Sequence, residues 1–411
     1  MNPAENSLTL EVTEVAFGGK GVARHEGKVI FVPGVLPNET VRAVVTREHR
    51  TYSEARLLEV VTPSAARIAP VCPLAVRAGG DGAAPVFCPG CSYQHVAYAE
   101  EVRIKTAHLQ TALASHVGAA PAVVQRPVVS PLDLGYRNKI VLHAQARGEG
   151  MALGYVAEDN VTVVDVPACP LAAPPLNALL ARLHDDAGFR KGLRDGMSVT
   201  LRYTARDGAL HWRRQAAANE TWLVEASTLG PVSVPRNSFY QVNTLVGDLL
   251  VEQVTRLLRE LDAAVCVDLF CGVGVFALAA ARLGVREVVG VDSDAEAIRA
   301  AEHNARRLEL AGVHWVCGPA ERALAAVGKS LQGPRGVLLV DPPRAGLGQR
   351  LIRHLARNAP GTILYVSCAA DTMARDAAWL QEAGYRLDSS RVLDMFPRTC
   401  HFESLTRFSR T

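Results

Sequence analysis

The second half of the chain is built from short apolar segments that alternate with helical ones. Five apolar, β-branched runs follow one another: VCVDLF, REVVGVD, VHWVC, GVLLVD and GTILYVS. Helices are expected after each run, at residues 274–283, 294–310, 320–328, 347–358 and 371–383. Strands that are hydrophobic throughout and alternate with helices predict a mostly parallel sheet covered on both faces. We therefore assign residues 236–411 to one α/β domain.

The first half is organised differently and predicts two further domains. Short β-type runs broken by turn residues fill residues 7–60, and this spacing indicates a small barrel, which we place at residues 1–61. The stretch TPSAARIAP is typical of a linker, and residues 62–235 then form a central domain of mixed strands and turns. Helices are expected there at 96–117 and near 175–190. Helix 96–117 is a candidate to pack on the C-terminal domain.

Composition restricts the class of protein more than its function. The 411 residues are 49% hydrophobic and 21% charged, and their net charge of +3 is evenly spread. Charge alone therefore does not indicate a nucleic-acid partner. No stretch is long and apolar enough to span a bilayer, and the N-terminus lacks the basic and apolar run of a signal peptide. We expect a soluble, cytoplasmic and monomeric protein with no membrane partner.

A glycine turn and neighbouring acids indicate a nucleotide site in the second half. The first strand leads into DLFCGVG, where Gly272 and Gly274 let a ligand approach the backbone at the start of a helix. Asp292 ends the second strand, where a carboxylate accepts hydrogen bonds from ribose hydroxyls. Asp268 suits a ligand with an amino group or cationic centre better than a pyrophosphate. The pattern favours S-adenosylmethionine over NAD, and the alternative is an ordinary turn with surface acids.

Two strand ends of the same sheet carry further reactive side chains. Asp341 precedes two prolines, which stiffen the turn, and Cys368 ends the fifth strand, with Glu403 further on. Ligands bind at the carboxyl ends of such strands. The alternatives are that Asp341 only caps a helix and that Cys368 is only a buried packing residue. A thiol and two carboxylates beside an adenosyl ligand suit methylation of uracil C5. In that reaction a thiolate adds to C6, C5 attacks the methyl group, and a base removes the C5 proton.

Six short motifs follow one another in the second half: FYQVN at 239–243, DLFCGVG at 268–274, DPPR at 341–344, SC at 367–368, MARD at 373–376 and HFE at 401–403. Together they resemble the S-adenosylmethionine-dependent RNA uracil-5 methyltransferases, particularly the iron–sulfur members that modify ribosomal RNA. The resemblance covers nearly the whole chain and implies a Rossmann-like methyltransferase domain. It implies that Cys368 is the nucleophile, that Glu403 removes the C5 proton, and that Asp341 holds the uracil edge.

The same resemblance implies contacts with the cofactor and the substrate. The cofactor site would comprise Gln241, Asp268, Phe270, Gly272, Gly274, Asp292 and Asp341. The substrate site would comprise Phe239, Gln241, Asn243 and Arg137. A strand-edge aromatic and a turn asparagine are the alternatives for Phe239 and Asn243. Arg137 belongs to the segment GYRNKI, in which Tyr136 and Lys139 are further candidates to face RNA.

The chain departs from the family pattern beside the catalytic cysteine. The family usually has Asn-Pro at this point, whereas this chain has Ala369 and Ala370. Asn and Pro would cap and pre-set the next helix, so their absence predicts a looser turn around Cys368. Phe402 also stands where the family usually has a smaller apolar residue, just before the glutamate. These departures motivate a second hypothesis, an RNA-binding iron–sulfur protein with a decayed catalytic domain, which the retained Cys368 and Glu403 argue against.

Four cysteines of the first half are candidates for metal ligands. Nine cysteines in a cytoplasmic chain suggest metal, catalysis or packing rather than disulfides. Cys72, Cys88 and Cys91 lie close together in sequence and Cys169 is distant. Such a set can hold one iron–sulfur cluster or zinc, or can be unrelated buried thiols. The resemblance implies a [4Fe–4S] cluster on these four thiols, with the insertion RAGGDGAAPV looping outward between the first two.

The N-terminal stretch EVTEVAFGGKGVARHEGKVIFVPGVLPNETV resembles the TRAM barrel, of OB-like form, that is fused to these enzymes. Such barrels bind RNA, and Lys20, Arg24 and Lys28 are either phosphate contacts or solvated loop charges. The implied partner is RNA, first of all 23S ribosomal RNA, with transfer RNA as an alternative. A methyltransferase for an exocyclic amine is a third hypothesis. A target uridine must leave any helix to reach Cys368.

Overall fold

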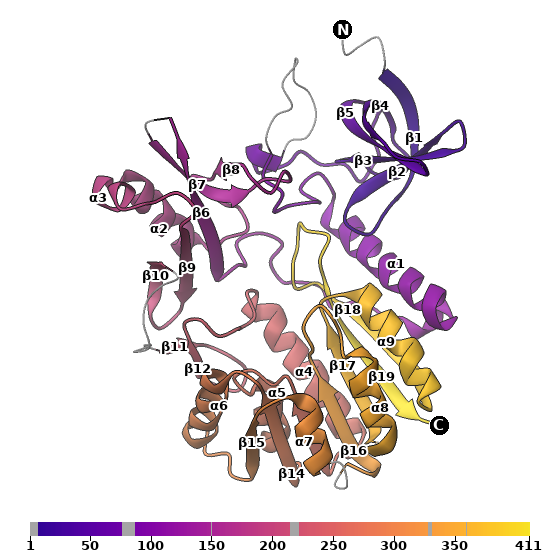
Figure 1. Ribbon diagram of the computed structural model, residues 1–411, viewed down its shortest axis with the longest axis vertical. Coiled ribbons are helices and arrows are strands. Elements are labelled where there is room, and N and C mark those ends of the chain that lie inside the picture. Colours follow the sequence, from indigo (N-terminus) through magenta and orange to yellow (C-terminus); the bar gives the residue numbers. More distant parts are fainter. Residues whose placement is uncertain (1–6, 76–86, 149, 214–221, 328–330, 359) are drawn as a thin grey trace.

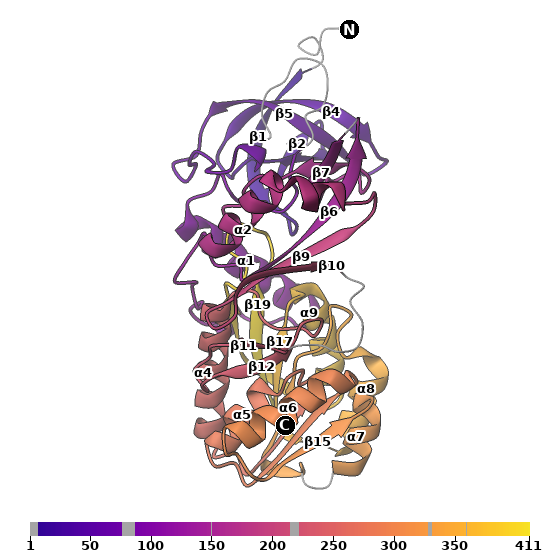
Figure 2. The ribbon, with the colours of Figure 1, turned by 90° about the vertical axis from the view of Figure 1, so that its left-hand side faces the viewer.

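The computed structural model describes residues 7–75, 87–148, 150–213, 222–327, 331–358 and 360–411. The described residues form three folded units (Figures 1 and 2). In Figure 1 the N-terminal barrel lies at the upper right, the smaller sheet domain at the upper left, and the large α/β domain below both. The insertion RAGGDGAAPV, predicted to loop outward, falls at 77–86 and lies outside the described residues.

The N-terminal unit is a closed barrel with the strand order β1-β2-β3-β5-β4. Inward-facing residues such as Leu10, Ile30 and Leu57 form a core that is separate from the other domains. Closure of the barrel leaves no open sheet edge. The strands are β1 Ser7–Val15, β2 Lys20–His25, β3 Lys28–Pro33, β4 Thr40–Glu48 and β5 Tyr52–Thr62. The predicted barrel is therefore confirmed.

The middle unit is an antiparallel sheet of order β10-β9-β6-β7-β8 with helix α2 packed against it. Instead of one helix near 175–190 there are two, because Asp186 ends the first and accepts the Phe189 N–H at 2.9 Å to cap the second. The elements are α2 Pro174–Asp185, α3 Ala187–Lys191, β6 Lys139–Arg147, β7 Gly150–Val156, β8 Val163–Asp165, β9 Ser198–Thr204 and β10 Gly208–Arg213. Short 3-10 turns lie at Pro73–Ala75 and Pro121–Val123, and a ribbon of β11 Trp222–Glu225 and β12 Val232–Pro235 follows.

The C-terminal unit is a seven-stranded sheet of order β15-β14-β13-β16-β17-β19-β18. The first five strands of this order pair in parallel, and β19 is antiparallel to both of its neighbours. The strands are β13 Val265–Leu269, β14 Glu287–Asp292, β15 Val313–Cys317, β16 Gly333–Val340, β17 Pro360–Ser367, β18 Tyr385–Leu393 and β19 Glu403–Arg410. The predicted mostly parallel α/β sheet is confirmed.

Helices cover both faces of this sheet. Residues of α4, α5 and α6 pack in the core on one face, and residues of α7, α8 and α9 pack on the other. The helices are α4 Thr244–Glu260, α5 Val275–Arg282, α6 Ala295–Arg307, α7 Ala320–Val327, α8 Gly348–Asn358 and α9 Ala370–Glu382. Helix α4 was not predicted. Across the part of the chain that the structure describes, no helix is long and apolar enough to cross a membrane.

Helix α1, Tyr98–Val117, belongs in sequence to the middle segment but packs on the C-terminal sheet domain (Figure 1). Leu109 and Leu113 are fully buried in the same core as α9. The buried Lys105 Nζ donates to Glu101 Oε1 and to Asp394 Oδ1, both at 2.7 Å. The Arg398 N–H donates to Glu101 Oε1 at 2.7 Å. Helix α1 therefore fixes the loop 394–402 that leads into β19.

Candidate active site

Three chemically reactive side chains gather at the carboxyl edge of the C-terminal sheet. Asp341 directly follows β16 and Cys368 directly follows β17, and these strands are parallel neighbours. Glu403 is the first residue of β19, where Ser404 pairs with Ser367 across from β17. Sequence reasoning predicted all three residues, and strand pairing brings them to one place. The three side chains therefore form one candidate catalytic site.

Burial and mutual repulsion shape the proton affinity of this site. Burial, and then the neighbouring Asp341, raise the pKa of the Glu403 carboxyl well above its usual range. Burial also raises the pKa of Asp341 to about 7. The half-buried Cys368 thiol has its pKa raised by burial and then by Glu403. Among the described residues, Glu403 Oε2 has no hydrogen-bond partner, so this buried oxygen is available to a proton or a ligand.

Arg344 completes the site and was missed by the sequence analysis, although the motif DPPR contains it. The side chain is exposed, and its positive charge lowers the pKa values of both Glu403 and Cys368. It therefore opposes the effect of burial on the pKa values of these two groups. The signal in the sequence was the position of an arginine three residues after Asp341.

Ser367 holds the turn in which alanines replace the expected Asn-Pro. The Ala369 N–H donates to Ser367 Oγ at 3.1 Å, and the same hydroxyl donates to the Ala369 carbonyl at 3.1 Å. Helix α9 begins without a side-chain cap, since Ala369 has none to offer. The Ser367 hydroxyl thus supplies local bonds to the residue after Cys368. This finding counters the prediction of a looser turn.

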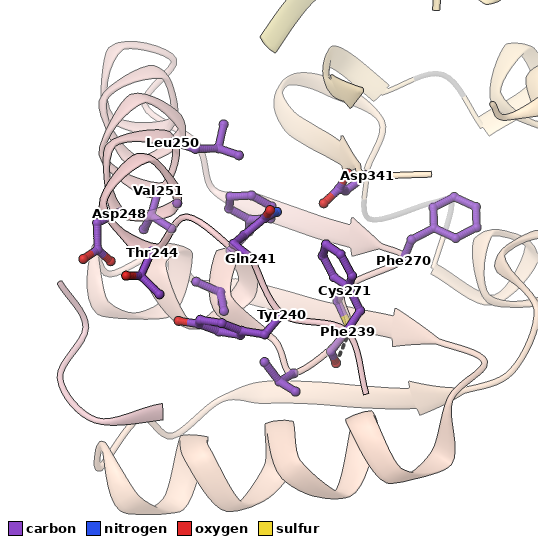
Figure 3. A pocket seen from close by; sticks show the side chains of 15 residues that line it. Phe239, Tyr240, Gln241, Thr244, Asp248, Leu250, Val251, Phe270, Cys271 and Asp341 are labelled. Carbon is purple, nitrogen blue, oxygen red and sulfur yellow. Dashed lines mark hydrogen bonds between the residues drawn. The ribbon is translucent and has the colours of Figure 1, made fainter. Parts of the chain in front are cut away.

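A pocket next to the catalytic edge matches most of the predicted cofactor site (Figure 3). The Gln241 amide and the Asp341 carboxylate extend into the same space from opposite sides. Gly272 has a φ of +54° and no heavy atom within 4 Å of an added Cβ, so the backbone there is open to a ligand. The predicted residues that line the pocket are Phe239, Gln241, Phe270, Gly272 and Asp341.

Three other predicted cofactor residues support this pocket from outside its lining. Asp292 accepts the Gly272 N–H at 2.8 Å and thereby fixes the glycine turn. Asp268 is fully buried and accepts the Ala277 N–H at 3.0 Å, while its Oδ1 has no partner among the described residues. Gly274 is needed for packing, because an added Cβ would lie 2.4 Å from the Trp315 ring. Direct contacts of these three residues with a cofactor stay predictions.

Helix α4 supplies the part of the pocket that sequence reasoning missed. Thr244, Asp248, Leu250 and Val251 line it, together with Tyr240 from the preceding segment. Apolar residues at helical spacing after a capping asparagine were the available signal.

Asn243 has a structural role, and its contact with the substrate stays a prediction. Its side chain is fully buried and accepts the Val246 N–H at 3.3 Å, which caps α4. Its amide also donates to Ser130 Oγ at 3.1 Å and to the Met395 carbonyl at 3.3 Å. The alternative of a structural turn asparagine is the one that the structure supports. Phe239, by contrast, is 68% exposed at the rim of the pocket.

The segment 135–138 joins the middle domain to the candidate active site. Tyr136 is buried, and its hydroxyl donates to the Pro397 carbonyl at 2.9 Å, so it does not face RNA as predicted. The Asn138 N–H donates to the Val242 carbonyl at 2.9 Å, beside Gln241. The Arg137 N–H donates to the Leu171 carbonyl at 2.8 Å. One short segment therefore touches the cofactor segment, the loop before Glu403 and the segment after Cys169.

The four predicted metal ligands line a single pocket of about 320 Å³ in the middle domain. Cys72, Cys88, Cys91 and Cys169 are all buried. Burial raises the pKa of Cys91 to about 12, and the nearby Cys169 and Cys88 thiols add to the rise. Arg137 lines the same pocket and brings a positive charge beside the thiols. The chemistry of this set suits a thiolate-bound metal centre.

The arrangement of the four thiols can be compared with the geometry that a bound metal centre needs. Within the described ranges, no group of three or more His, Cys, Asp or Glu residues is arranged to hold a metal ion. A zinc site needs its sulfur atoms about 2.3 Å from one ion, and an iron–sulfur cluster is likewise held by its thiolates, so either centre would need the four thiols to face it. Two of the sulfur atoms already accept hydrogen bonds from neighbouring side chains: Gln94 Nε2 donates to Cys91 Sγ at 3.5 Å, and the Tyr155 hydroxyl donates to Cys169 Sγ at 3.8 Å.

The sheet order and the site at its carboxyl edge define the class of α/β methyltransferases. The family model described as tRNA (Uracil-5-)-methyltransferase matches residues 232–410, and the model of the TRAM domain matches residues 7–58. The 23S rRNA (uracil(1939)-C(5))-methyltransferase RlmD of Pectobacterium atrosepticum is 33% identical, over 99% of this chain and 94% of that protein. The protein of the same name from Aeromonas hydrophila is 31% identical, over 95% of this chain and 93% of that protein.

The chain belongs to the S-adenosylmethionine-dependent RNA uracil-C5 methyltransferases and carries an N-terminal TRAM domain. A solved structure has the same fold: Pyrococcus abyssi tRNA (uracil-54, C5)-methyltransferase in complex with S-adenosyl-L-homocysteine. Its TM-score is 0.73 at 24% identity, over 97% of this chain and 99% of that chain. The resemblance to the RNA uracil-5 methyltransferases and to the TRAM barrel is confirmed, and so are the enzyme class and the methyl donor, whereas the iron–sulfur cluster stays a prediction.

Proposed function

We propose that this enzyme methylates C5 of a uridine in 23S ribosomal RNA and that Cys368 carries the reaction as a covalent nucleophile. The observation that carries the proposal is the meeting of Cys368, Asp341 and Glu403 at one sheet edge, beside the pocket lined by Gln241. The choice of ribosomal RNA rests on the names of the relatives, which the chain matches over nearly their full length.

The proposed reaction begins at the Cys368 sulfur. Its thiolate forms a bond to C6 of the uracil, and the electron pair shifts to C5 and O4 as an enolate. C5 then attacks the methyl group of the bound donor, which leaves as S-adenosylhomocysteine. Glu403 takes the proton from C5, and the S–C6 bond breaks to restore the thiolate and the aromatic ring. Asp341 holds the uracil edge, and Arg344 favours the ionised states of the thiol and the base.

The donor site is proposed to use the residues that line and support the pocket. Gln241 and the Gly272 backbone contact the methionine end, and Asp292 accepts hydrogen bonds from the ribose. The unpartnered Asp268 Oδ1 is an acceptor for the amino group. Phe239, at the exposed rim, and Arg137 are proposed substrate contacts.

A covalent trap tests this proposal. The enzyme is mixed with S-adenosylmethionine and with 23S ribosomal RNA transcribed with 5-fluorouridine, whose fluorine cannot leave as a proton. We expect an adduct that survives denaturation, and none with Cys368→Ala. Transfer RNA transcripts run in parallel and test the alternative substrate. An adduct that forms equally well in Cys368→Ala would overturn the role of this thiol, and preferential modification of transfer RNA would overturn the ribosomal target.

The pocket of four cysteines is proposed to hold a [4Fe–4S] cluster. Four buried thiols that line one pocket together with Arg137 support it. When bound, such a cluster would cross-link the segments around Cys72, Cys88, Cys91 and Cys169. Those segments reach the active site through the hydrogen bonds of residues 135–138, so the proposed role is structural. Protein purified without oxygen should be brown and contain iron and labile sulfide. A colourless sample with stoichiometric zinc would contradict the cluster.

A monomeric state and a cytoplasmic location stay predictions.

A further inference from the structure

The tip of the β1–β2 hairpin carries an exposed phenylalanine to the edge of the catalytic domain. Phe17 is 51% exposed, and its ring centroid lies 5.7 Å from that of His108 and 6.5 Å from that of Phe402. Phe402 is buried and directly precedes Glu403. A ring from the barrel is thus packed against the neighbour of the proposed base.

The hairpin tip is held in place from the side of the protein. His108 Nε2 lies 2.8 Å from the Val15 carbonyl, so the imidazole donates this hydrogen bond from helix α1. The Gly19 N–H donates to the Ala16 carbonyl at 3.0 Å. Gly19, with a φ of +89°, lies so close to Ser92 that an added Cβ would come within 2.8 Å of the serine Cβ. A side chain on such a fixed turn loses little conformational freedom when it binds a ligand.

The surroundings of Phe17 indicate a single ring-sized contact rather than an apolar patch. Gly18, the next residue, is exposed and carries no side chain, and Lys20 is engaged with Glu54 Oε1 at 2.9 Å. Two rings support Phe17 from within, and about half of its surface is exposed. An exposed aromatic ring on a fixed turn is a surface on which unpaired nucleobases stack.

We propose that Phe17 is a stacking platform for an RNA base next to the target uridine. This inference rests on the proposed function, because the target base must leave its stack to reach Cys368 and its neighbours then lose a stacking partner. A ring beside Phe402 is placed to replace that partner. The barrel would then contribute a base contact at the mouth of the active site, in addition to phosphate contacts on its strands.

The test uses a transcribed segment of 23S ribosomal RNA that contains the uridine position named for the relatives. We expect Phe17→Ala to raise the KM for RNA about tenfold, with kcat and the melting temperature unchanged, because one stacked base is worth about 5- to 150-fold in affinity. Phe17→Tyr should restore the KM. Val61→Ala, at a barrel residue that is also 51% exposed, is the matched control and should leave the KM unchanged.

A second series locates the base. Each nucleotide flanking the target is replaced in turn by an abasic one, and RNA affinity is measured with and without Phe17→Ala. We expect one abasic position to weaken binding by wild type and to have no further effect in the variant. If the two losses add at every position, or if Phe17→Ala binds RNA as wild type does, the platform is refuted. Binding is measured separately from methylation, so a wild type that binds RNA without methylating it would count against the proposed function alone.

Discussion

The molecule has two sites built from cysteines, and they differ in burial and in the charges beside the thiols. Cys368 is half-buried at a strand end, with two carboxylates and one arginine close enough to change its proton affinity. The four cysteines of the middle domain are buried, and the charge beside them is the cation Arg137. A thiol that must bond and release needs neighbours that move protons, whereas thiols that only hold need burial and a compensating charge. The environment of a cysteine, more than its position in a motif, therefore distinguishes a thiol that is proposed to react from thiols that are proposed to hold a metal centre.

The largest effect is expected from the variant that removes the thiol of Cys368, the proposed nucleophile. Cys368→Ala should lower turnover at least about a thousandfold, because no other group can form the C6 bond. Iron content and melting temperature should stay at the wild-type values. Cys266→Ala, at a buried cysteine in strand β13, is the control and should retain turnover. Comparable losses in both variants, measured as methyl transfer to RNA, would mean that Cys368 acts only through packing.

Removal of the base should trap the reaction halfway. Glu403→Gln keeps the size of the side chain but cannot accept the C5 proton, so turnover should fall by about 10²- to 10⁴-fold. The covalent adduct should then accumulate on ordinary RNA and appear as a slower band on denaturing gels. Glu225→Gln alters another buried carboxylate, one paired with Arg202 in the middle domain, and should trap no adduct. Turnover by Glu403→Gln without a trapped adduct would assign the proton transfer to another residue.

Loss of one holding thiol should affect stability more than chemistry. If the proposed cluster is bound, Cys169→Ser should abolish bound iron and lower the melting temperature on the order of 5–10 °C, since the native state then loses a tightly bound group. Protein that remains folded should still form the adduct with 5-fluorouridine RNA. Iron and labile sulfide assays with scanning calorimetry measure the first effect. An adduct yield that falls in parallel with iron content, in fully folded protein, would place the cysteine pocket in the reaction itself.

The smallest expected effect is a shift of the pH profile. The pKa of Glu403 is raised and the proposed base must be ionised to accept a proton, so the rate of wild type should still increase with pH above the range in which a glutamate usually ionises. Asp341→Asn removes a negative neighbour and should move the acidic limb of the residual activity down by about one pH unit. Arg344→Ala removes a positive neighbour and should move that limb up. Shifts in the same direction for both variants would contradict the electrostatic description of the site.

Strand ends were the most predictable part of this molecule. Asp341 and Cys368 could be placed together from the sequence because the carboxyl ends of parallel strands share one edge. The pairing of Ser404 with Ser367, which brings in Glu403, depends on an antiparallel strand that local pattern does not reveal. The motifs supplied that residue instead. Helix α4 was not predicted, although apolar residues such as Val246, Leu250 and Val254 recur in it at helical spacing.

Long-range polar contacts could not be predicted at all. Lys105 and Asp394 are 289 residues apart, and nothing local in either segment indicates a buried ion pair. The capping role of Asn243 could not be predicted, because a capping asparagine and a ligand-binding asparagine look alike in a motif. The bonds of the Ser367 hydroxyl to Ala369 could not be predicted either, because they depend on the local conformation of the turn and not on a capping residue at position 369.

The ion pair between Lys105 and Asp394 has a consequence for how such enzymes are inherited and rebuilt. The base Glu403 lies just beyond a loop that is fastened by a helix encoded far upstream. A gene fragment that starts at the methyltransferase fold would therefore encode the catalytic side chains without the part that orients one of them. Exchange between relatives, by recombination or by design, should succeed when α1 travels with the C-terminal domain and fail when the cut separates them.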